Sequence, residues 1–198
     1  IVEAVNAGTK ADLPLNFLAV SDSAELQSRC ARTYIRDRFP RSPRPLWTGE
    51  RYPHDRIRVA YVSADFRDHA VSLLMAGLFE AHDRDRFETI AVSLQPEDQS
   101  TTGRRVRAAF GRFVDVSGMS DREAATRLRE LEVDIAVDLT GSTADARTGI
   151  LAQRCAPIQV NYLGFPATMG AEYVDYIIAD RFVIPEDRRT HYSEKVVY

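Results

Sequence analysis

The fold is decided by residues 57–69, which read Ile57-Arg58-Val59-Ala60-Tyr61-Val62-Ser63-Ala64-Asp65-Phe66-Arg67-Asp68-His69. The first six residues are mostly β-branched, aromatic or aliphatic, which is typical of a strand buried in a sheet. A polar segment follows, and after His69 the apolar residues of 71–81 recur at helical spacing. A strand, a polar loop and a helix in this order predict one half of a parallel βαβ unit.

The same alternation continues along the chain. Ser120 and Glu123 have the spacing of a capping box at the start of a helix. Strands that alternate with helices predict an α/β fold with a Rossmann-like, doubly wound parallel sheet, because right-handed crossovers place helices on both faces. Further strands are expected at residues 87–94, 113–116, 133–139, 158–163 and 174–179, and helices at 102–110, 121–131 and 145–153.

Residues 1–52 have a different character. A helix is expected at 22–38, and four prolines at positions 40, 43, 45 and 53 then predict an extended linker. We therefore divide the chain into a helical region with its linker, residues 1–52, and a Rossmann-like half-domain, residues 53–198. Because the chain lacks an initial Met and ends in an apolar segment at residues 196–198, we expect a piece of a longer protein.

Composition narrows the function classes. With 198 residues, 44% hydrophobic and 28% charged residues and a net charge of −3, the chain has the profile of an ordinary globular protein and not of a nucleic-acid-binding one. It has no secretion signal and no apolar run of the roughly 18 residues that a membrane helix needs. Cys30 and Cys155 lie far apart without metal-ligand spacing, and we interpret them as buried thiols in a reducing compartment, the cytoplasm.

Three loops are candidates for a binding site. In a parallel α/β sheet, ligands bind outside the carboxyl ends of the strands, where the strand order reverses. The loops at residues 63–70, 140–143 and 164–170 should therefore open on one edge, and a strand order of 3-2-1-4-5 would place the first two beside the crevice. None of them is a glycine-rich dinucleotide or phosphate loop, and no zinc-protease, thiol-redox or serine-hydrolase motif occurs.

The sequence leaves two interpretations of His69 open. Its place before a helix favours the neutral imidazole, which can accept a proton; alternatively, the ring only caps the helix or orders the loop. Asp65 is expected to hold Arg67 or a backbone amide. Asp138, at the end of a buried strand, either takes part in function or braces the loop after it, and His82 is expected at the surface.

Five segments resemble one family, in the family's order. Residues 57–69 resemble the motif RIGYVSxDFxxH, residues 138–147 resemble DLNGYTxGAR, and residues 156–171 resemble APIQVxYLGYPGTxGA, all in the catalytic region of protein O-GlcNAc transferases. Residues 175–180 and 192–195 then follow in the same order. The chain thus resembles the bacterial and SPINDLY-like members of glycosyltransferase family 41.

The resemblance implies a two-domain GT-B fold with the active site between two Rossmann-like halves. The chain corresponds to the first half, preceded in residues 1–52 by the end of a tetratricopeptide region, and it lacks the second half, which holds most of the nucleotide. The implied reaction is an inverting, metal-independent transfer of GlcNAc from UDP-GlcNAc to Ser or Thr of a protein, and the half alone is expected to be inactive. The alternatives are a relative that uses another nucleotide sugar, such as UDP-glucose with an Asn acceptor, and a non-catalytic binding module.

The resemblance also implies site residues. His69 matches a histidine that lines the active site and has been proposed as the base. Ser142 stands where the family often has Tyr, Ala167 where it often has Gly, and Arg129 where many eukaryotic members have His; these positions bear on specificity. The residues expected to line the donor and acceptor cleft are Asp65, Phe66, Arg67, Gly141, Ser142, Thr143, Gly164, Phe165, Pro166, Ala167 and Thr168.

Overall fold

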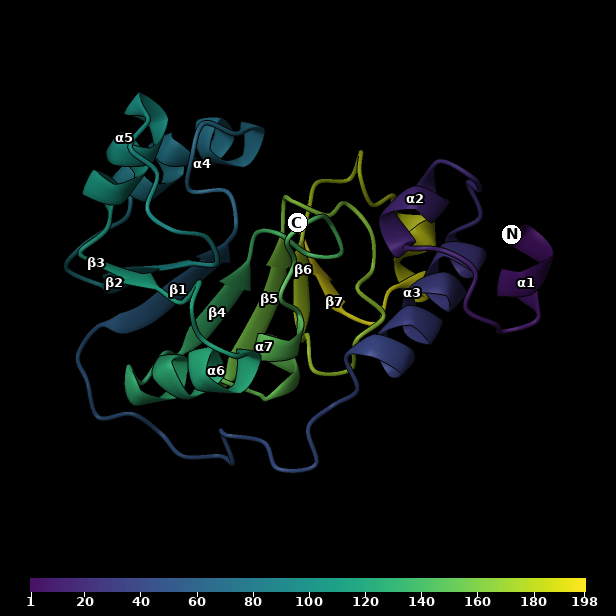
Figure 1. Cartoon of the computed structure of the whole chain (residues 1–198), viewed down its shortest axis with the longest axis horizontal. Helices are drawn as coiled ribbons and strands as arrows, with labels where there is room; N and C mark the ends of the chain where they lie inside the picture. The colour runs from purple at the N-terminus through teal and green to yellow at the C-terminus, as the bar shows by residue number, and fades with distance from the viewer.

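One parallel sheet runs through the molecule. The computed structural model describes all 198 residues, and its seven strands have the order β3-β2-β1-β4-β5-β6-β7 (Figure 1). The chain runs outward from β1 to β3, returns to the centre at β4 and continues outward to β7, so the predicted doubly wound class is confirmed. The first five strands have the order 3-2-1-4-5, under which the first two candidate loops lie beside the crevice. The strands are β1 (Ile57–Ser63), β2 (Phe87–Ser93), β3 (Arg112–Asp115), β4 (Ile135–Asp138), β5 (Ile158–Tyr162), β6 (Tyr176–Ile178) and β7 (Lys195–Val197).

Helices alternate with the first five strands. The α6 helix begins at the predicted capping box, in which the side chains of Ser120 and Glu123 each bind the backbone N–H of the other. The helices are α1 (Val2–Asn6), α2 (Pro14–Leu18), α3 (Ala24–Arg38), α4 (Ala70–Glu80), α5 (Thr101–Ala109), α6 (Asp121–Glu130), α7 (Gly149–Ala152) and the 3-10 helix η1 (Glu186–His191).

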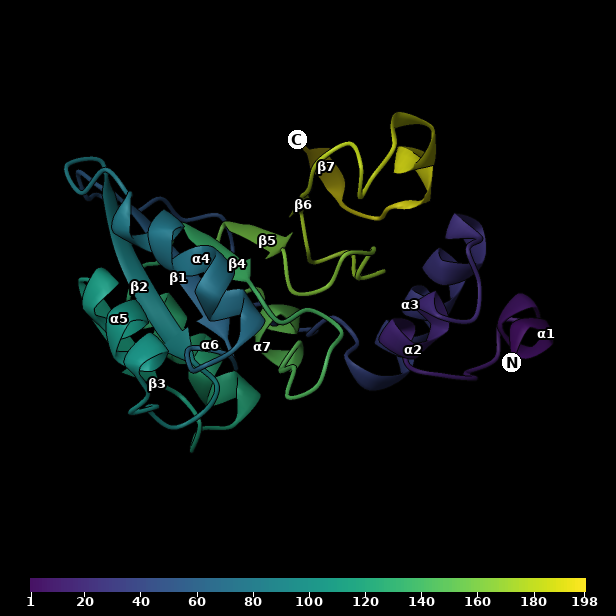
Figure 2. The ribbon, with the colours of Figure 1, turned by 90° about the horizontal axis from the view of Figure 1, so that it is seen from above.

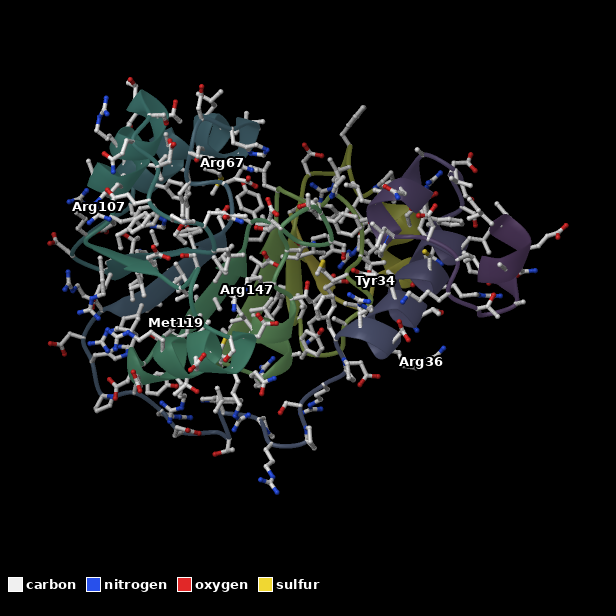
Figure 3. All side chains as sticks on the ribbon, in the orientation of Figure 1. Tyr34, Arg36, Arg67, Arg107, Met119 and Arg147 are labelled. Atoms are coloured by element: carbon white, nitrogen blue, oxygen red, sulfur yellow. The ribbon has the colours of Figure 1, made fainter.

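The helix expected at residues 145–153 is wrong in length, since only α7 forms. Asp145 has a left-handed φ of 59°, which ends any helix at that point. Nη1 of Arg147 then donates to Val116 O at 2.8 Å, and its Nη2 donates to Met119 O at 2.6 Å (Figure 3 labels Arg147 and Met119). These long-range contacts fix residues 145–148 as a loop.

Alternate residues of β1 contribute to two cores, one on each face of the sheet. Val59 and Tyr61 belong to an aromatic-rich cluster with side chains of α4 and α5. Ala60 and Val62 belong to a larger cluster with side chains of α6 and α7, and Figure 1 shows the two helix pairs on opposite faces. Successive side chains of a strand point to opposite faces, so a sheet covered on both sides requires strands that are apolar at nearly every position.

The amino-terminal helices lie at one end of the molecule, beyond β7 (Figures 1 and 2). Ile35 of α3 belongs to the larger core of the sheet. A Cβ at Gly170 would lie 2.5 Å from Arg32 N, so glycine at this position permits the close approach of α3. The α1 and α2 helices pack on α3 through a separate cluster of Val5, Phe17 and Cys30.

The proline-rich segment between α3 and β1 is attached to the half-domain. The backbone N–H groups of Ser42, Leu46 and Trp47 donate to the carbonyl oxygens of residues 152, 153 and 154, in that order. The guanidinium of Arg154 lies over the Trp47 ring, 5.5 Å from its centroid. The segment therefore follows one path along the surface.

Two smaller predictions have different outcomes. Cys30 and Cys155 are free and buried, as predicted, and burial raises the pKa of the Cys155 thiol to about 12. His82, expected at the surface, is half-buried: its Nε2 lies 2.7 Å from the Tyr61 hydroxyl, and partial burial lowers the pKa of its imidazole. None of the helices combines the length and the apolar character that a transmembrane span requires.

Candidate functional site

The chain leaves β1, β4 and β5 side by side. Val62 of β1 pairs with Asp138 of β4, which in turn pairs with Asn161 of β5. The three strands are parallel and end within one residue of this line, so their carboxyl ends share one edge, as predicted. We call this edge the rim, and its segments are the β1–α4 loop (residues 64–69), the β4–α7 loop (residues 139–148) and the β5–β6 crossover (residues 163–175).

The three segments of the rim contact one another. Ala64 N donates to Thr140 Oγ1 at 3.2 Å, which joins the β1–α4 loop to the β4–α7 loop. A Cβ at Gly164 would lie 1.9 Å from Leu139 O, so the β5–β6 crossover reaches the β4–α7 loop only because residue 164 is glycine. The rim is therefore one continuous surface built from three distant parts of the sequence. β1 and β4 are also the pair at which the strand order reverses, where ligands of such sheets bind.

The β1–α4 loop is held by residues close in sequence. Asp65 is buried; its carbonyl oxygen accepts from Ser72 Oγ at 2.5 Å, and its N–H donates to Ser63 Oγ at 3.0 Å. Nη2 of Arg67 lies 3.1 Å from Asp65 Oδ1, as predicted for this pair, and 3.9 Å from Asp145 Oδ2 in the β4–α7 loop. The Arg67 side chain remains 46% exposed, near the start of α4 in Figure 3, so part of its charge is accessible to a ligand.

His69 is the N-cap residue of α4, and its side chain is 41% exposed. Its Nδ1 lies 3.3 Å from Val71 N and 3.6 Å from Asp65 Oδ2. When Nδ1 accepts from Val71, it caps the helix, and the proton of the neutral ring is on Nε2. When Nδ1 carries the proton, it faces the Asp65 carboxylate, and Nε2 is free to accept a proton. The geometry thus accommodates both interpretations of His69, one in each tautomer.

The β4–α7 loop turns around a buried carboxylate. Oδ1 of Asp138 accepts from Thr140 N at 2.9 Å and from Gly141 N at 3.1 Å, which is the loop-bracing role expected for it. Burial raises the pKa of Asp138, and the two backbone donors oppose this shift. Gly141 has a φ of 60°, and a Cβ there would lie 2.4 Å from Phe165 Cβ. Thr143 Oγ1 donates to Thr140 O at 2.8 Å, which closes the turn.

The β5–β6 crossover contains no helix, in contrast to most βαβ units. Two amide side chains of β5 satisfy its backbone instead. Nδ2 of Asn161 donates to Phe165 O at 3.3 Å and to Ala167 O at 3.4 Å, and Nε2 of Gln159 donates to Tyr173 O at 2.6 Å. Because buried backbone groups require partners, these two residues determine the path of the crossover.

The predicted cleft residues divide into two groups by exposure. Phe66 and Phe165 are 4% and 1% exposed, and the Phe66 ring packs 5.7 Å from the Phe110 ring. Both side chains therefore support the rim from inside the core. Exposed or half-exposed on the rim are Arg67, His69, Thr143, Gly164 and Pro166, whereas Asp65, Gly141, Ser142, Ala167 and Thr168 are buried beneath it.

Sequence reasoning missed two residues that shape this site. Asn161 was predicted only as part of the strand at residues 158–163, with no role in the site. Its buried Oδ1 has no hydrogen-bond partner. Glu194 was included only in a matching segment, although it is 4% exposed and binds the β5–β6 crossover. For Asn161 the available signal was a polar residue between Val160 and Tyr162, because such a residue is buried only with partners. Glu194 stands between Ser193 and Lys195, and this polar stretch gave no signal of burial.

A polar hollow of about 630 Å³ borders the rim, between the loops that follow β2, β3 and β4. Asp145 and Arg147 lie on its rim side, and Gln95 and Ser120 lie farther out. No three His, Cys, Asp or Glu side chains gather into a group that could hold a metal ion. The chemistry on the rim is therefore that of an imidazole, carboxylates, a guanidinium and backbone amides.

These features define the class of protein: a Rossmann-like α/β fold whose doubly wound parallel sheet reverses its strand order between β1 and β4. The model of Glycosyl transferase family 41 matches residues 44–198. The chain belongs to this family.

Relatives of the chain include two named enzymes. Over 143 residues it is 40% identical to a probable UDP-N-acetylglucosamine–peptide N-acetylglucosaminyltransferase SEC of Arabidopsis thaliana. This match covers 72% of the chain and 15% of the relative. Over 144 residues it is 36% identical to the UDP-N-acetylglucosamine–peptide N-acetylglucosaminyltransferase of Caenorhabditis elegans, again 72% of the chain and 12% of the relative. A solved mutant O-GlcNAc transferase of Thermobaculum terrenum matches 93% of the chain with a TM-score of 0.80 and 29% identity, and the chain covers 36% of it.

Proposed function

We propose that this chain supplies one wall of the active-site cleft of a transferase that moves GlcNAc from UDP-GlcNAc to Ser or Thr hydroxyls of proteins. Membership of family 41 and the names of the relatives support the reaction class. The observation that carries the proposal is the half-exposed imidazole of His69 on the rim, backed by the buried carboxylate of Asp65. A cytoplasmic location, protein acceptors and independence from nucleic acid and membranes are part of the same proposal.

The proposed step is a single displacement. A Ser or Thr hydroxyl is a weak nucleophile until a base accepts its proton as the new bond forms. The hydroxyl oxygen attacks the anomeric carbon of GlcNAc, its proton passes to Nε2 of His69, and the bond to the UDP oxygen breaks with its electron pair going to UDP. Attack from the face opposite UDP inverts the anomeric centre. The Asp65 carboxylate beside Nδ1 stabilises the imidazolium that forms.

The groups that hold most of UDP are expected outside these 198 residues. The chain covers 36% of the solved bacterial transferase, and the step uses no metal, so the leaving diphosphate needs cationic groups or a helix N-terminus from the opposite wall. We therefore expect the 198 residues alone to transfer no sugar. Transfer by the isolated chain would contradict the shared-cleft proposal.

Substitution of His69 tests the base in the full-length protein. Asn is a good N-cap residue, so His69→Asn removes the imidazole but keeps a cap for α4. We expect kcat to fall by about 10²- to 10⁴-fold at nearly unchanged Tm. His69→Ala should lose the same activity and, in addition, about 1 kcal/mol of stability with the cap.

The control variant is Ser23→Ala, which removes the side-chain cap of α3 far from the rim. It should lose stability to a similar extent with an unchanged kcat. Wild-type turnover in His69→Asn would exclude His69 as the base.

The donor is tested by competition: inhibition of transfer by UDP-glucose but not by UDP-GlcNAc would favour a relative that uses another sugar.

A further inference from the structure

Glu194, directly before β7, is a buried carboxylate that the proposed reaction does not use. The residue is only 4% exposed. Its Oε1 accepts from Met169 N at 2.6 Å, and its Oε2 accepts from Thr168 Oγ1 at 2.6 Å and from Ser193 Oγ at 3.0 Å. Two of these three donors belong to the β5–β6 crossover, 26 and 25 residues away in sequence.

The neighbouring contacts hold the same segment from a second side. Oγ1 of Thr168 also accepts from Ser193 N at 3.2 Å and from Gly170 N at 3.1 Å. Gly170 in turn packs so closely on α3 that a Cβ would lie 2.5 Å from Arg32 N. Residues 168–170 are therefore fixed between the start of β7 and the backbone of α3.

The carboxylate carries much of this attachment. A segment without a helix has no repeating backbone hydrogen bonds, so its shape depends on side-chain partners. Burial of a carboxylate is costly unless strong, charge-assisted hydrogen bonds offset it, and its removal leaves Met169 N without a buried acceptor. The three residues that precede Thr168 include Pro166, which is exposed on the rim.

We propose that Glu194 is a positioning residue for the transferase site: it holds the β5–β6 crossover so that the accessible residues Gly164 and Pro166 face the nucleotide sugar. The inference rests on the proposed function for the identity of the ligand. The attachment of the crossover by Glu194 is independent of that identity, and it is tested separately.

Hydrogen exchange in the full-length protein tests the attachment without reference to activity. In Glu194→Gln, one carboxylate oxygen becomes an NH₂ group, which donates and cannot accept. We expect the amides of residues 164–170 to exchange about tenfold faster or more, while residues 64–69 keep the wild-type rate. Glu186→Gln is the matched control, because it removes the charge of an exposed acid from nearby η1 and should change neither segment.

A second variant keeps the test decisive if Glu194→Gln folds poorly. Thr168→Val replaces the hydroxyl that binds Glu194 by a methyl group of similar shape and leaves the carboxylate in place. Faster exchange confined to residues 164–170 is expected again. Wild-type exchange of this segment in the folded variants overturns the proposal.

Kinetics of the full-length enzyme separate positioning from a general structural role. We expect Glu194→Gln to raise KM for UDP-GlcNAc about fivefold or more, with a smaller change in kcat. A variant that is only less well folded would lose apparent kcat and keep its KM, and this result would overturn the positioning role. If the wild-type protein transfers nothing from UDP-GlcNAc, the proposed function fails, while the exchange experiment still decides whether Glu194 holds the crossover.

Discussion

The β1–α4 loop and the β5–β6 crossover are two parts of one rim that are held in opposite ways. Contacts in the β1–α4 loop join Asp65 to Ser63 and Ser72, two and seven residues away. Contacts in the crossover join Thr168 and Met169 to Glu194, across 26 and 25 residues. The first segment depends mainly on residues close in sequence, with one backbone bond to Thr140, and the second depends on α3, β5 and β7.

This difference predicts how far a disturbance spreads. A change in the contacts of Asp65 should remain near the start of α4, because the serines that bind it are close in sequence. A change in the crossover should loosen several elements together, because it separates surfaces that only the folded sheet brings into contact. The following predictions test the contrast, beginning with the largest effect.

Gly164→Ala should be the most damaging substitution. It places a Cβ 1.9 Å from Leu139 O, a backbone atom that cannot rotate away. The crossover and the β4–α7 loop must then separate, and we expect the free energy of unfolding to fall by about 3 kcal/mol or more. Urea unfolding of the chain should show a lower midpoint.

The control for this prediction is Gly77→Ala. Gly77 is exposed within α4, and a Cβ there meets nothing within 4 Å. Alanine at this position should stabilise the helix by about 0.5–1 kcal/mol. Wild-type stability of Gly164→Ala would show that the crossover and the β4–α7 loop do not touch in solution, and the contrast between the two segments would lose its basis.

The same contrast explains what could be predicted from the sequence. The doubly wound class, the capping box of α6, the Asp65–Arg67 pair and the shared edge of the three loops all follow from short-range patterns or general rules of parallel sheets. Such features depend on residues close in sequence or on chirality. They could therefore be predicted from the sequence.

The features that escaped prediction depend on contacts between distant residues. Helix α7 is short because Arg147 binds carbonyl groups about 30 residues earlier, at Val116 and Met119. The burial of Phe66 and the role of Glu194 likewise depend on elements that pack only after folding. No local pattern identifies such partners, which is why the least regular part of the rim was also the least predictable.

Ser72→Ala should have an intermediate effect and a local one. It removes the donor to the buried carbonyl oxygen of Asp65, which should reduce stability by about 1–2 kcal/mol. Hydrogen exchange should accelerate in residues 64–69 and remain unchanged in residues 164–170. Ser28→Ala, at a buried serine within α3, is the control and should change stability by less than about 0.5 kcal/mol. Equal acceleration in both segments of the rim would contradict the local character of the β1–α4 loop.

Asp138 provides the prediction with the smallest effect. It combines local hydrogen bonds to Thr140 N and Gly141 N, like those of the β1–α4 loop, with a buried carboxylate, like that of Glu194. Asp138→Asn keeps an oxygen that can accept from both amides and removes the ionisable group. The variant should therefore fold normally and differ from the wild type mainly in its pH dependence.

Burial raises the pKa of Asp138 above its unfolded value, so between the two values the folded chain holds a proton that the unfolded chain has released. Wild-type stability is therefore lost as pH rises through this window, whereas Asp138→Asn has no such loss. The Tm of Asp138→Asn minus that of the wild type should increase with pH above about 4, the ordinary Asp value. Asp37→Asn should give the opposite slope and only below about pH 4, because a hydrogen bond from Lys10 lowers the pKa of Asp37 and its stabilisation is lost as pH falls below the ordinary Asp value. A Tm difference for Asp138→Asn that stays flat or falls with pH would mean that water reaches this carboxylate, and that the β4–α7 loop is open at its base.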